Sequence, residues 1–287
     1  MNILKPKAKL IRIYPIFHFI PGDPRAPTAW RKDGGMHWLN TTPNSKNANM
    51  LMDAALASKT KDLHRIGIAV HGYVDSWAHQ NFVGYHSAFN AMSGPLGTFA
   101  PNIGHADAGH NPDEPALVWQ DLRLKDERVD NKTRFLEAAE CLLQKLLRFA
   151  DPSVSQKAVK NEGEKLRKDL DTAIGARDRK NERREERIAR YKELGSKRDY
   201  GGRDLPEYDE DKWFDEAVNE DARGLRDRSD FSLTRWDPLT DKYTWKDARN
   251  YTKTNWYRFQ EAVKQHQDDS WDRLSKRNLK GLDLPEL

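Results

Sequence analysis

The stretch GIAVHGYVDSWAHQNFVG, residues 67–84, decides the expected fold because it repeats apolar and polar side chains at helical spacing. Its apolar residues and those just before it nearly surround a helix: Leu63, Ile66, Ile68, Val70, Tyr73, Val74 and Trp77. A helix that is apolar on almost every side belongs in a protein interior. We therefore expect a central buried helix from about Asp62 to Phe82.

Three polar residues of this helix follow a regular step, His71-x3-Asp75-x3-His79. Positions i, i+4 and i+8 of an α-helix lie on one face. Burying such groups without partners is costly, so they either meet polar partners or bind a metal. His64 and His86 join the same stripe if the helix extends far enough. No HExxH motif is present, which excludes the zincin class of metalloproteases.

A second group of candidate ligands lies in GHADAGHNPDEP, residues 104–115. This string contains His105, Asp107, His110 and Asp113 in a glycine-rich context that lets side chains converge. The helix and this loop together offer about four to six ligands, enough for one metal ion or for two ions roughly 3.5–4 Å apart. Taken alone, the loop is equally consistent with Asx turns and helix-capping histidines.

The distribution of charge favours a cation site. The 287 residues contain 49 Lys and Arg against 45 Asp and Glu, a net charge of +4, yet no Lys or Arg occurs between Arg65 and Arg123. Five of the nine histidines lie in that stretch. If these imidazoles converge with the nearby carboxylates, a divalent metal is the cation that suits them. The alternative is a core helix and a surface loop whose histidines never meet.

Composition excludes several classes of protein. No run of about 18 apolar residues occurs, which argues against a membrane span. The single Cys141 excludes an internal disulfide framework and a multi-cysteine zinc site. Pro15 and Pro21 interrupt the apolar start and no small-residue cleavage site follows. We therefore expect no signal peptide, and a cytoplasmic location or export without a classical signal.

Other segments predict further helices. One helix begins near Asn44 or Ser45 and ends at 59–61, and another begins at Asp130 or Asn131. The segment from about 155 to 195 is highly charged and has only a thin apolar stripe. That pattern is typical of a long helix or a helical hairpin projecting from the body.

We thus expect a mainly α protein, with a compact helical core, long ordered loops and a charged helical insertion. Residues 1–152 form the helical core with the metal site, 153–205 the charged arm, and 206–287 short helices that pack back on the core. Residues 84–118, rich in Gly and Pro, form a long ordered loop. Such loops in compact domains are usually functional or disordered, and the His and Asp content favours function.

Four strings in order resemble an uncharacterised bacterial family, the domain-of-unknown-function family 6765: YPIFHFIPG (14–22), TPNSKNANML (42–51), RIGIAVHGYVDSWAHQNFVG (65–84) and NIGHADAGHNPDEPALVW (102–119). Further similarity surrounds DNKTRFLEAAE (130–140). The resemblance covers roughly the first half of the chain. It implies no activity, because the family itself is uncharacterised.

A more distant resemblance is to the zinc-dependent phospholipase C and single-strand nuclease superfamily. Those all-α enzymes hold a zinc cluster with a His-x3-Asp step on a core helix, which His71 and Asp75 match. This sequence departs from the pattern after that step. The superfamily has a further histidine six residues after the aspartate, whereas His79 lies four after it, and those enzymes also use a mature amino terminus that the ordinary Met1 does not match.

The expected function is that of a metal-dependent hydrolase, zinc being the expected metal and a phosphodiester of a phospholipid or nucleic acid the expected substrate. The predicted metal ligands are His71, Asp75, His79, His105, His110 and Asp113, and the predicted catalytic residues are Asp75 and His110. The alternative is a non-enzymatic interaction module, effector or toxin whose histidines bind a structural metal or pack in the core. The charged arm would then contact a protein partner. Basic residues beyond position 150 alternate with acids, so no nucleic-acid-binding surface is predicted.

Overall fold

The computed structural model describes residues 13–58, 62–92, 103–219 and 244–277. The chain divides into two units, one made of residues 1–205 and 266–287 and the other of residues 206–265. The candidate site lies in the first unit. The three-part division expected from composition stays a prediction.

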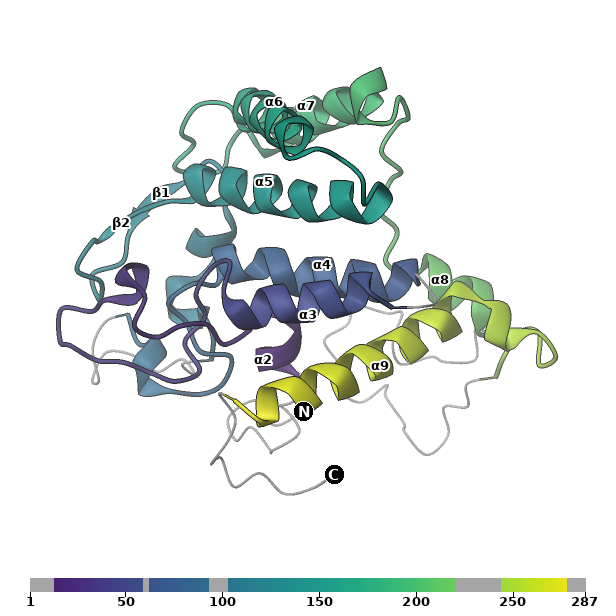
Figure 1. The fold of residues 1–287 in the computed structure, drawn as a ribbon, viewed down its shortest axis with the longest axis horizontal. Helices are drawn as coiled ribbons and strands as arrows, with labels where there is room; N and C mark the ends of the chain where they lie inside the picture. The colour runs from purple at the N-terminus through teal and green to yellow at the C-terminus, as the bar shows by residue number, and fades with distance from the viewer. Residues whose placement is uncertain (1–12, 59–61, 93–102, 220–243, 278–287) are drawn as a thin grey trace. The chain divides into compact units, whose positions relative to one another are not determined.

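The centre of the first unit is helix α4 (Leu63–Ala78), as the apolar pattern predicted. It packs against α2 (Tyr14–Phe17), α3 (Lys46–Leu56) and α5 (Asn131–Ala150). Figure 1 shows α4 between α3 and α5. A helix in contact with three neighbours needs apolar residues around most of its circumference, which explains its sequence.

Both ends of α4 have identifiable causes. Asp62 caps the first turn, its side chain accepting a hydrogen bond from the His64 backbone N–H at 3.0 Å. The helix ends at Ala78, four residues before the expected end near Phe82. Asn81 adopts a φ of +71°, a left-handed conformation that turns the chain away. The helix therefore stops before residue 86, and the condition under which His86 would join the histidine stripe is not met.

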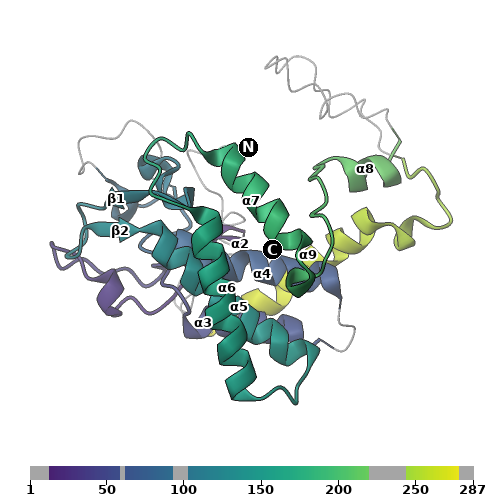
Figure 2. The same cartoon turned by 90° about the horizontal axis from the view of Figure 1, so that it is seen from above.

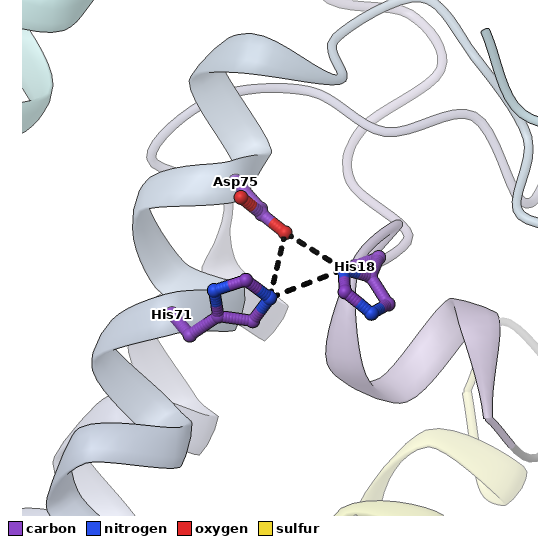
Figure 3. Close-up of side chains that lie close together, drawn as sticks. All are labelled: His18, His71 and Asp75. Atoms are coloured by element: carbon purple, nitrogen blue, oxygen red, sulfur yellow. Dashed lines mark hydrogen bonds and ion pairs between the residues drawn. The ribbon is translucent and has the colours of Figure 1, made fainter. Parts of the chain in front are cut away.

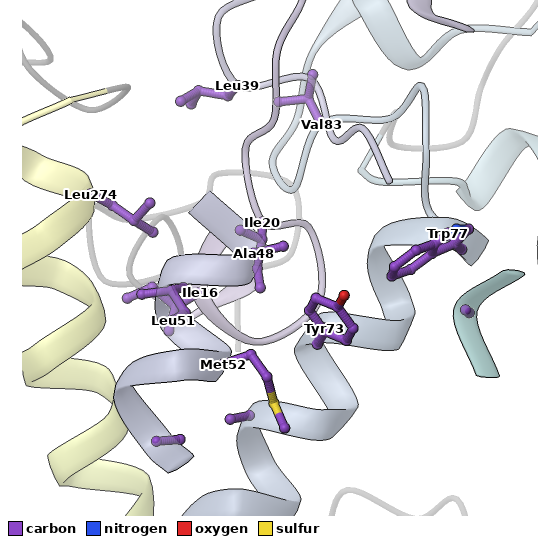
Figure 4. Packing of buried hydrophobic residues seen from close by; sticks show 13 residues of the cluster. Ile16, Ile20, Leu39, Ala48, Leu51, Met52, Tyr73, Trp77, Val83 and Leu274 are labelled. Atoms are coloured by element: carbon purple, nitrogen blue, oxygen red, sulfur yellow. The ribbon is translucent and has the colours of Figure 1, made fainter. Parts of the chain in front are cut away.

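The core surrounds the buried face of α4 (Figure 4). Its buried members come from α2, α3, α4, α5, the connecting segments and the end of α9 (Asn255–Ser275): Ile16, Ile20, Leu39, Ala48, Leu51, Met52, Ala55, Ala69, Tyr73, Trp77, Val83, Ala138 and Leu274. Tyr73 and Trp77 are each 1% exposed and meet edge to face. Burial of such large side chains is the main source of stability in a fold of this kind.

The charged segment forms a helical hairpin, one of the two predicted alternatives. Helix α6 (Gln156–Ile174) and helix α7 (Arg184–Ser196) lie next to each other in Figures 1 and 2. The prediction that it projects from the body is wrong for α6, which packs along α5. The thin apolar stripe suffices for this contact, because Val159 and Ile174 are both buried.

The expected long loop, residues 84–118, contains short 3-10 turns, and a two-stranded ribbon begins at its last residue. Strand β1 (Val118–Gln120) pairs in antiparallel fashion with β2 (Arg128–Asp130), and Trp119 lies opposite Val129. Short 3-10 turns occupy Ala106–Ala108 and Asn111–Asp113. Elements of three residues are too short to give a periodic sequence signal, which is why the sequence did not reveal them.

The predicted helix starts at Ser45 and Asp130 are confirmed by their capping hydrogen bonds. Ser45 accepts from the Ala48 N–H at 3.1 Å, and Asp130 accepts from the Thr133 N–H at 3.3 Å. The first of these helices ends at Leu56. The predicted end at 59–61 lies outside the described residues.

In the second unit, aromatic side chains pack around a short helix, α8 (Lys212–Ala217), and the start of α9. Phe214 meets Trp256 edge to face at 5.3 Å between ring centroids. Helix α9 has 21 residues, whereas short helices were expected in this part of the chain. The predicted mainly α class is confirmed. Among the helices in the described part of the chain, none pairs great length with the apolar character that crossing a bilayer requires.

A buried histidine in α9 gives the fold a predicted pH dependence. His266 is 2% exposed and packs against Phe17, and burial together with the nearby Arg65 charge lowers its pKa to about 4, against an opposing effect of Asp269. On acidification, His266 therefore becomes protonated near pH 6.5 in the unfolded chain but only near pH 4 in the folded chain. The free energy of unfolding should fall between these pH values by on the order of 3 kcal/mol from this residue.

Chemical denaturation of the wild type and a His266→Phe variant at pH 7 and pH 4.5 measures this contribution. The variant should lose clearly less stability on acidification than the wild type does. The matched control is His86→Phe at an exposed histidine, which should behave like the wild type. Equal acid sensitivity of the wild type and the His266 variant would contradict the prediction.

Candidate metal centre

One face of α4 carries His71 and Asp75 toward His18, which follows directly after α2. Figure 3 shows these three side chains pointing toward one another. His18 Nδ1 lies 3.0 Å from Asp75 Oδ2 and 3.1 Å from His71 Nε2, and His71 Nε2 lies 3.3 Å from the same carboxylate oxygen. Each offers one ligand atom to a shared point. We call these residues the first triad.

Close packing of α2 on α4 brings His18 into place. A Cβ atom at Gly72 would lie 3.1 Å from the carbonyl oxygen of Phe17, so a larger residue would press on this contact. Ile16, which is 0% exposed, anchors α2 in the core. The His18 backbone is thus fixed next to the helix turn that carries the other two residues.

A second cluster forms where α4 ends. His79 occupies the C-cap position, and its Nε2 lies 3.5 Å from Asp113 Oδ1. His105 Nε2 lies 3.6 Å from Asp113 Oδ2. The loop thus places one imidazole and one carboxylate against an imidazole of the core helix. We call His79, His105 and Asp113 the second triad.

Backbone carbonyls orient both imidazoles of the second triad. His79 Nδ1 lies 2.9 Å from the His18 carbonyl oxygen, and His105 Nδ1 lies 2.9 Å from the Gly109 carbonyl oxygen. A carbonyl oxygen only accepts hydrogen bonds, so each Nδ1 must carry the hydrogen. In the neutral ring the other nitrogen, Nε2, then presents a lone pair toward Asp113. Histidines that bind metals are usually held in this way.

Aromatic packing supports the same orientation. The Phe19 ring stacks on His79 at 4.5 Å between centroids with an interplanar angle of 18°. Gly104 adopts a φ of +54°, and a Cβ atom there would lie 2.4 Å from the Phe19 ring. Only glycine allows both the left-handed backbone and the close contact with Phe19, so Gly104 helps to position the adjacent His105.

Buried Arg134 supports the helix end that carries His79. Its guanidinium donates to the Ala78 carbonyl at 2.9 Å and to Asn131 Oδ1 at 3.2 Å. Burial lowers its pKa to about 9, against the opposing charges of Asp121 and Asp113. A cationic side chain from α5 therefore lies next to the end of α4, although the sequence between Arg65 and Arg123 contains no Lys or Arg.

Burial and neighbouring charges set the protonation of the cluster. Burial lowers the pKa of His71 and of His105, and it outweighs the opposing charges of Asp75 and Asp113. For His79, burial acts to lower the pKa, but the contact with Asp113 and the charge of Asp75 outweigh it, so the pKa is raised. For Asp113, burial raises the pKa, and the His79 contact and the nearby histidines outweigh it and lower the pKa. Neutral imidazole is thus favoured at His71 and His105, and the protonated form is favoured at His79, which lies near the carboxylates of Asp75 and Asp113.

Five of the six predicted metal ligands lie in the two triads, and one does not. The five are His71, Asp75, His79, His105 and Asp113. His110 is exposed and lies outside both triads, although its charge helps to lower the pKa of Asp113. Their roles as ligands stay a prediction.

Other polar residues of the motifs have partners elsewhere. Asp107 accepts a hydrogen bond from the Met92 backbone N–H at 3.3 Å, and His64 pairs with Asp62 at 3.0 Å. Exposed His86 lies in neither triad.

Sequence reasoning missed His18. The available signal was a lone imidazole in the apolar string YPIFHFIPG, between two prolines and without a nearby acid. Such a histidine has no periodic relation to the α4 stripe. Only the packing of α2 on α4 shows that it belongs there.

Comparison with known proteins gives a family and nothing more specific. The chain belongs to a family of unknown function (DUF6765), whose model matches residues 1–274. No curated protein and no solved structure matches the chain. The resemblance to the zinc-dependent phospholipase C and nuclease superfamily stays a prediction from the His71 and Asp75 step.

The role of Gly104 in positioning His105 is testable by substitution. A Gly104→Ala variant should lose about 1–3 kcal/mol of stability, because the added methyl group collides with Phe19 and the left-handed backbone disfavours alanine. The matched control is Gly34→Ala, which has a φ of +72° but open space around it and should lose less. Urea denaturation measures both, and equal losses would show that the Phe19 contact is unimportant.

Proposed function

We propose that this protein is a divalent-metal-dependent hydrolase, with zinc as its metal and phosphodiesters as its substrate class. The observation that carries the proposal is the orientation of the second triad. Two imidazoles are held through Nδ1 by backbone carbonyls and direct Nε2 toward one carboxylate. In the neutral ring each of these Nε2 atoms presents a lone pair toward Asp113, so a bound cation would take the place of the proton that Asp113 and Asp75 favour on His79.

The donor set fits zinc. Each triad offers two imidazole nitrogens and one carboxylate oxygen, the ligands that zinc uses in catalytic sites with three protein residues. A structural zinc is surrounded by about four protein ligands, whereas three leave a position for water or substrate. His71 and Asp113 have side chains that are 53% and 41% exposed, so solvent and substrate can reach both triads.

The two triads adjoin each other, which supports a phosphodiester as substrate. His79 Nδ1 lies 3.7 Å from Asp75 Oδ2, so a residue of one triad contacts a residue of the other. Paired metal ions in hydrolases stabilise the attacking and leaving oxygens of a phosphodiester and lower the pKa of water. Positive charge from metal would also replace the Lys and Arg that the sequence lacks between Arg65 and Arg123.

The chain's own residues would then divide the remaining work. Asp75 lies between His18 and His71, where its carboxylate holds both imidazoles and can accept a proton. His110 is exposed beside the second triad and is free to exchange protons with substrate or solvent. Histidine is the side chain that most often transfers a proton to or from a reacting group in enzymes.

The metal requirement is tested with a His71→Ala, Asp75→Ala double variant. We expect elemental analysis of the wild-type protein to find bound zinc, and the double variant to hold less of it. The variant should also lose at least about 100-fold in hydrolysis of a chromogenic phosphodiester, because a bound metal would supply the activated water.

The matched control is a His64→Ala, Asp62→Asn double variant. It alters a His–Asp pair on the same helix outside both triads and keeps a capping side chain at position 62. Unchanged hydrolysis in the His71, Asp75 variant would remove the proposal. Chelation that unfolds the protein would instead indicate a structural metal.

The proposed proton transfer by His110 has a separate test. A His110→Ala variant should retain the zinc content of the wild type but hydrolyse the phosphodiester roughly 100-fold more slowly, the usual loss when a general acid or base is removed. The control His86→Ala removes another exposed histidine and should have no effect. Wild-type turnover in the His110 variant would assign proton transfer to another group.

A further inference from the structure

A cavity of about 580 Å³ lies between the β1–β2 ribbon and the loop that joins α6 to α7. Its wall contains three arginines, Arg128, Arg177 and Arg179, together with Asn111 and Trp119. No carboxylate belongs to this wall as the described residues form it. Guanidinium groups gathered around a hollow without acids attract an anion.

The loop that carries two of these arginines is held firmly. The Asp178 backbone N–H donates to the Ala116 carbonyl at 2.9 Å. Its carboxylate accepts from Arg187 and from the Arg183 backbone N–H, both at 2.8 Å. Asp178 is thus bound to the start of α7 and to residue 116. These contacts fix the backbone of its two neighbours, Arg177 and Arg179, in the cavity wall.

The three arginines are only partly neutralised. Arg128 pairs with Asp130 at 3.0 Å. Arg177 donates to the Val118 carbonyl at 2.9 Å, and this hydrogen bond fixes the position of the guanidinium without neutralising its charge. Arg179 forms no hydrogen bond or ion pair with any residue in the described part of the chain. Among the described residues the cavity therefore keeps an excess of positive charge, and none of them accepts a hydrogen bond from the Arg179 side chain.

We infer that this cavity binds the phosphate group of a small, soluble organic phosphate. Arginine is the residue best suited to phosphate, because its planar group donates two parallel hydrogen bonds to two oxygens. The cavity is larger than a phosphate ion needs and falls within the range of small-molecule sites, roughly 300–1,000 Å³. Trp119 and Leu117 supply apolar wall for the organic part.

The cavity adjoins the loop of the candidate metal centre but does not depend on metal. The 3-10 turn Asn111–Asp113 contributes its first residue to the cavity wall and its last to the second triad. Asn131 holds this turn by donating to the Asn111 carbonyl at 2.6 Å. Because the arginines alone supply the positive charge of this cavity, we expect the metal-free protein to bind the phosphate as well.

Isothermal titration of the full chain with adenosine 5′-monophosphate, and separately with inorganic phosphate, tests the inference. EDTA removes metal, so binding at the triads does not contribute, and chloride keeps the ionic strength constant. We expect both probes to bind, the nucleotide more tightly. Arg179→Gln should weaken binding at least about tenfold through loss of charge-assisted hydrogen bonds, without lowering the melting temperature.

The matched control is Lys180→Gln, which removes the same charge from the adjacent exposed residue outside the cavity wall. It should bind like the wild type. No binding of either probe, or an equal loss in both variants, would overturn the inference. Binding to vesicles containing phosphatidic acid, with no binding of the soluble probes, would overturn it in favour of a lipid headgroup. None of these outcomes bears on the metal proposal, since metal is absent throughout.

Discussion

Two hydrogen bonds to backbone carbonyls determine the chemistry of the candidate metal centre. They hold His79 and His105 through Nδ1 and leave each Nε2 directed at Asp113. A carbonyl cannot donate, so the backbone itself fixes which nitrogen is free. One of these carbonyls belongs to His18, a member of the first triad. The same backbone segment therefore positions both triads, and a displacement of α2 would disturb both.

Close backbone approach makes this arrangement feasible. Gly72 lets α2 approach α4, and Gly104 lets the loop pack on Phe19. Both are places where a side chain would push a ligand-bearing segment away from the core helix. The buried core anchors the partners, through Ile16 on α2 and Tyr73 on α4. Fold stability and site geometry thus depend on the same few contacts, so substitutions near the site should affect both.

The sequence predicted the parts of the site that follow a helical period and missed those that depend on tertiary packing. Periodicity was sufficient for α4 and its step from His71 to His79. Composition was sufficient to single out the loop with His105 and Asp113, since a cation-free, imidazole-rich loop is unusual. His18 had no periodic relation to either. The early end of α4 at Ala78 depends on a left-handed residue that propensity alone does not reveal. The short β1–β2 ribbon likewise falls below the length at which alternation is detectable.

The account rests on the claim that the two triads gather around divalent cations. Anomalous scattering at the zinc absorption edge, from a crystal grown with zinc, tests it most directly because it locates the metal without reference to activity. The account predicts peaks enclosed by the first triad and by the second triad, with Nε2 of His79 and His105 about 2.0–2.1 Å from zinc. Coordinates in which both triads contain only water and hydrogen bonds among the same side chains, despite added zinc, would contradict it.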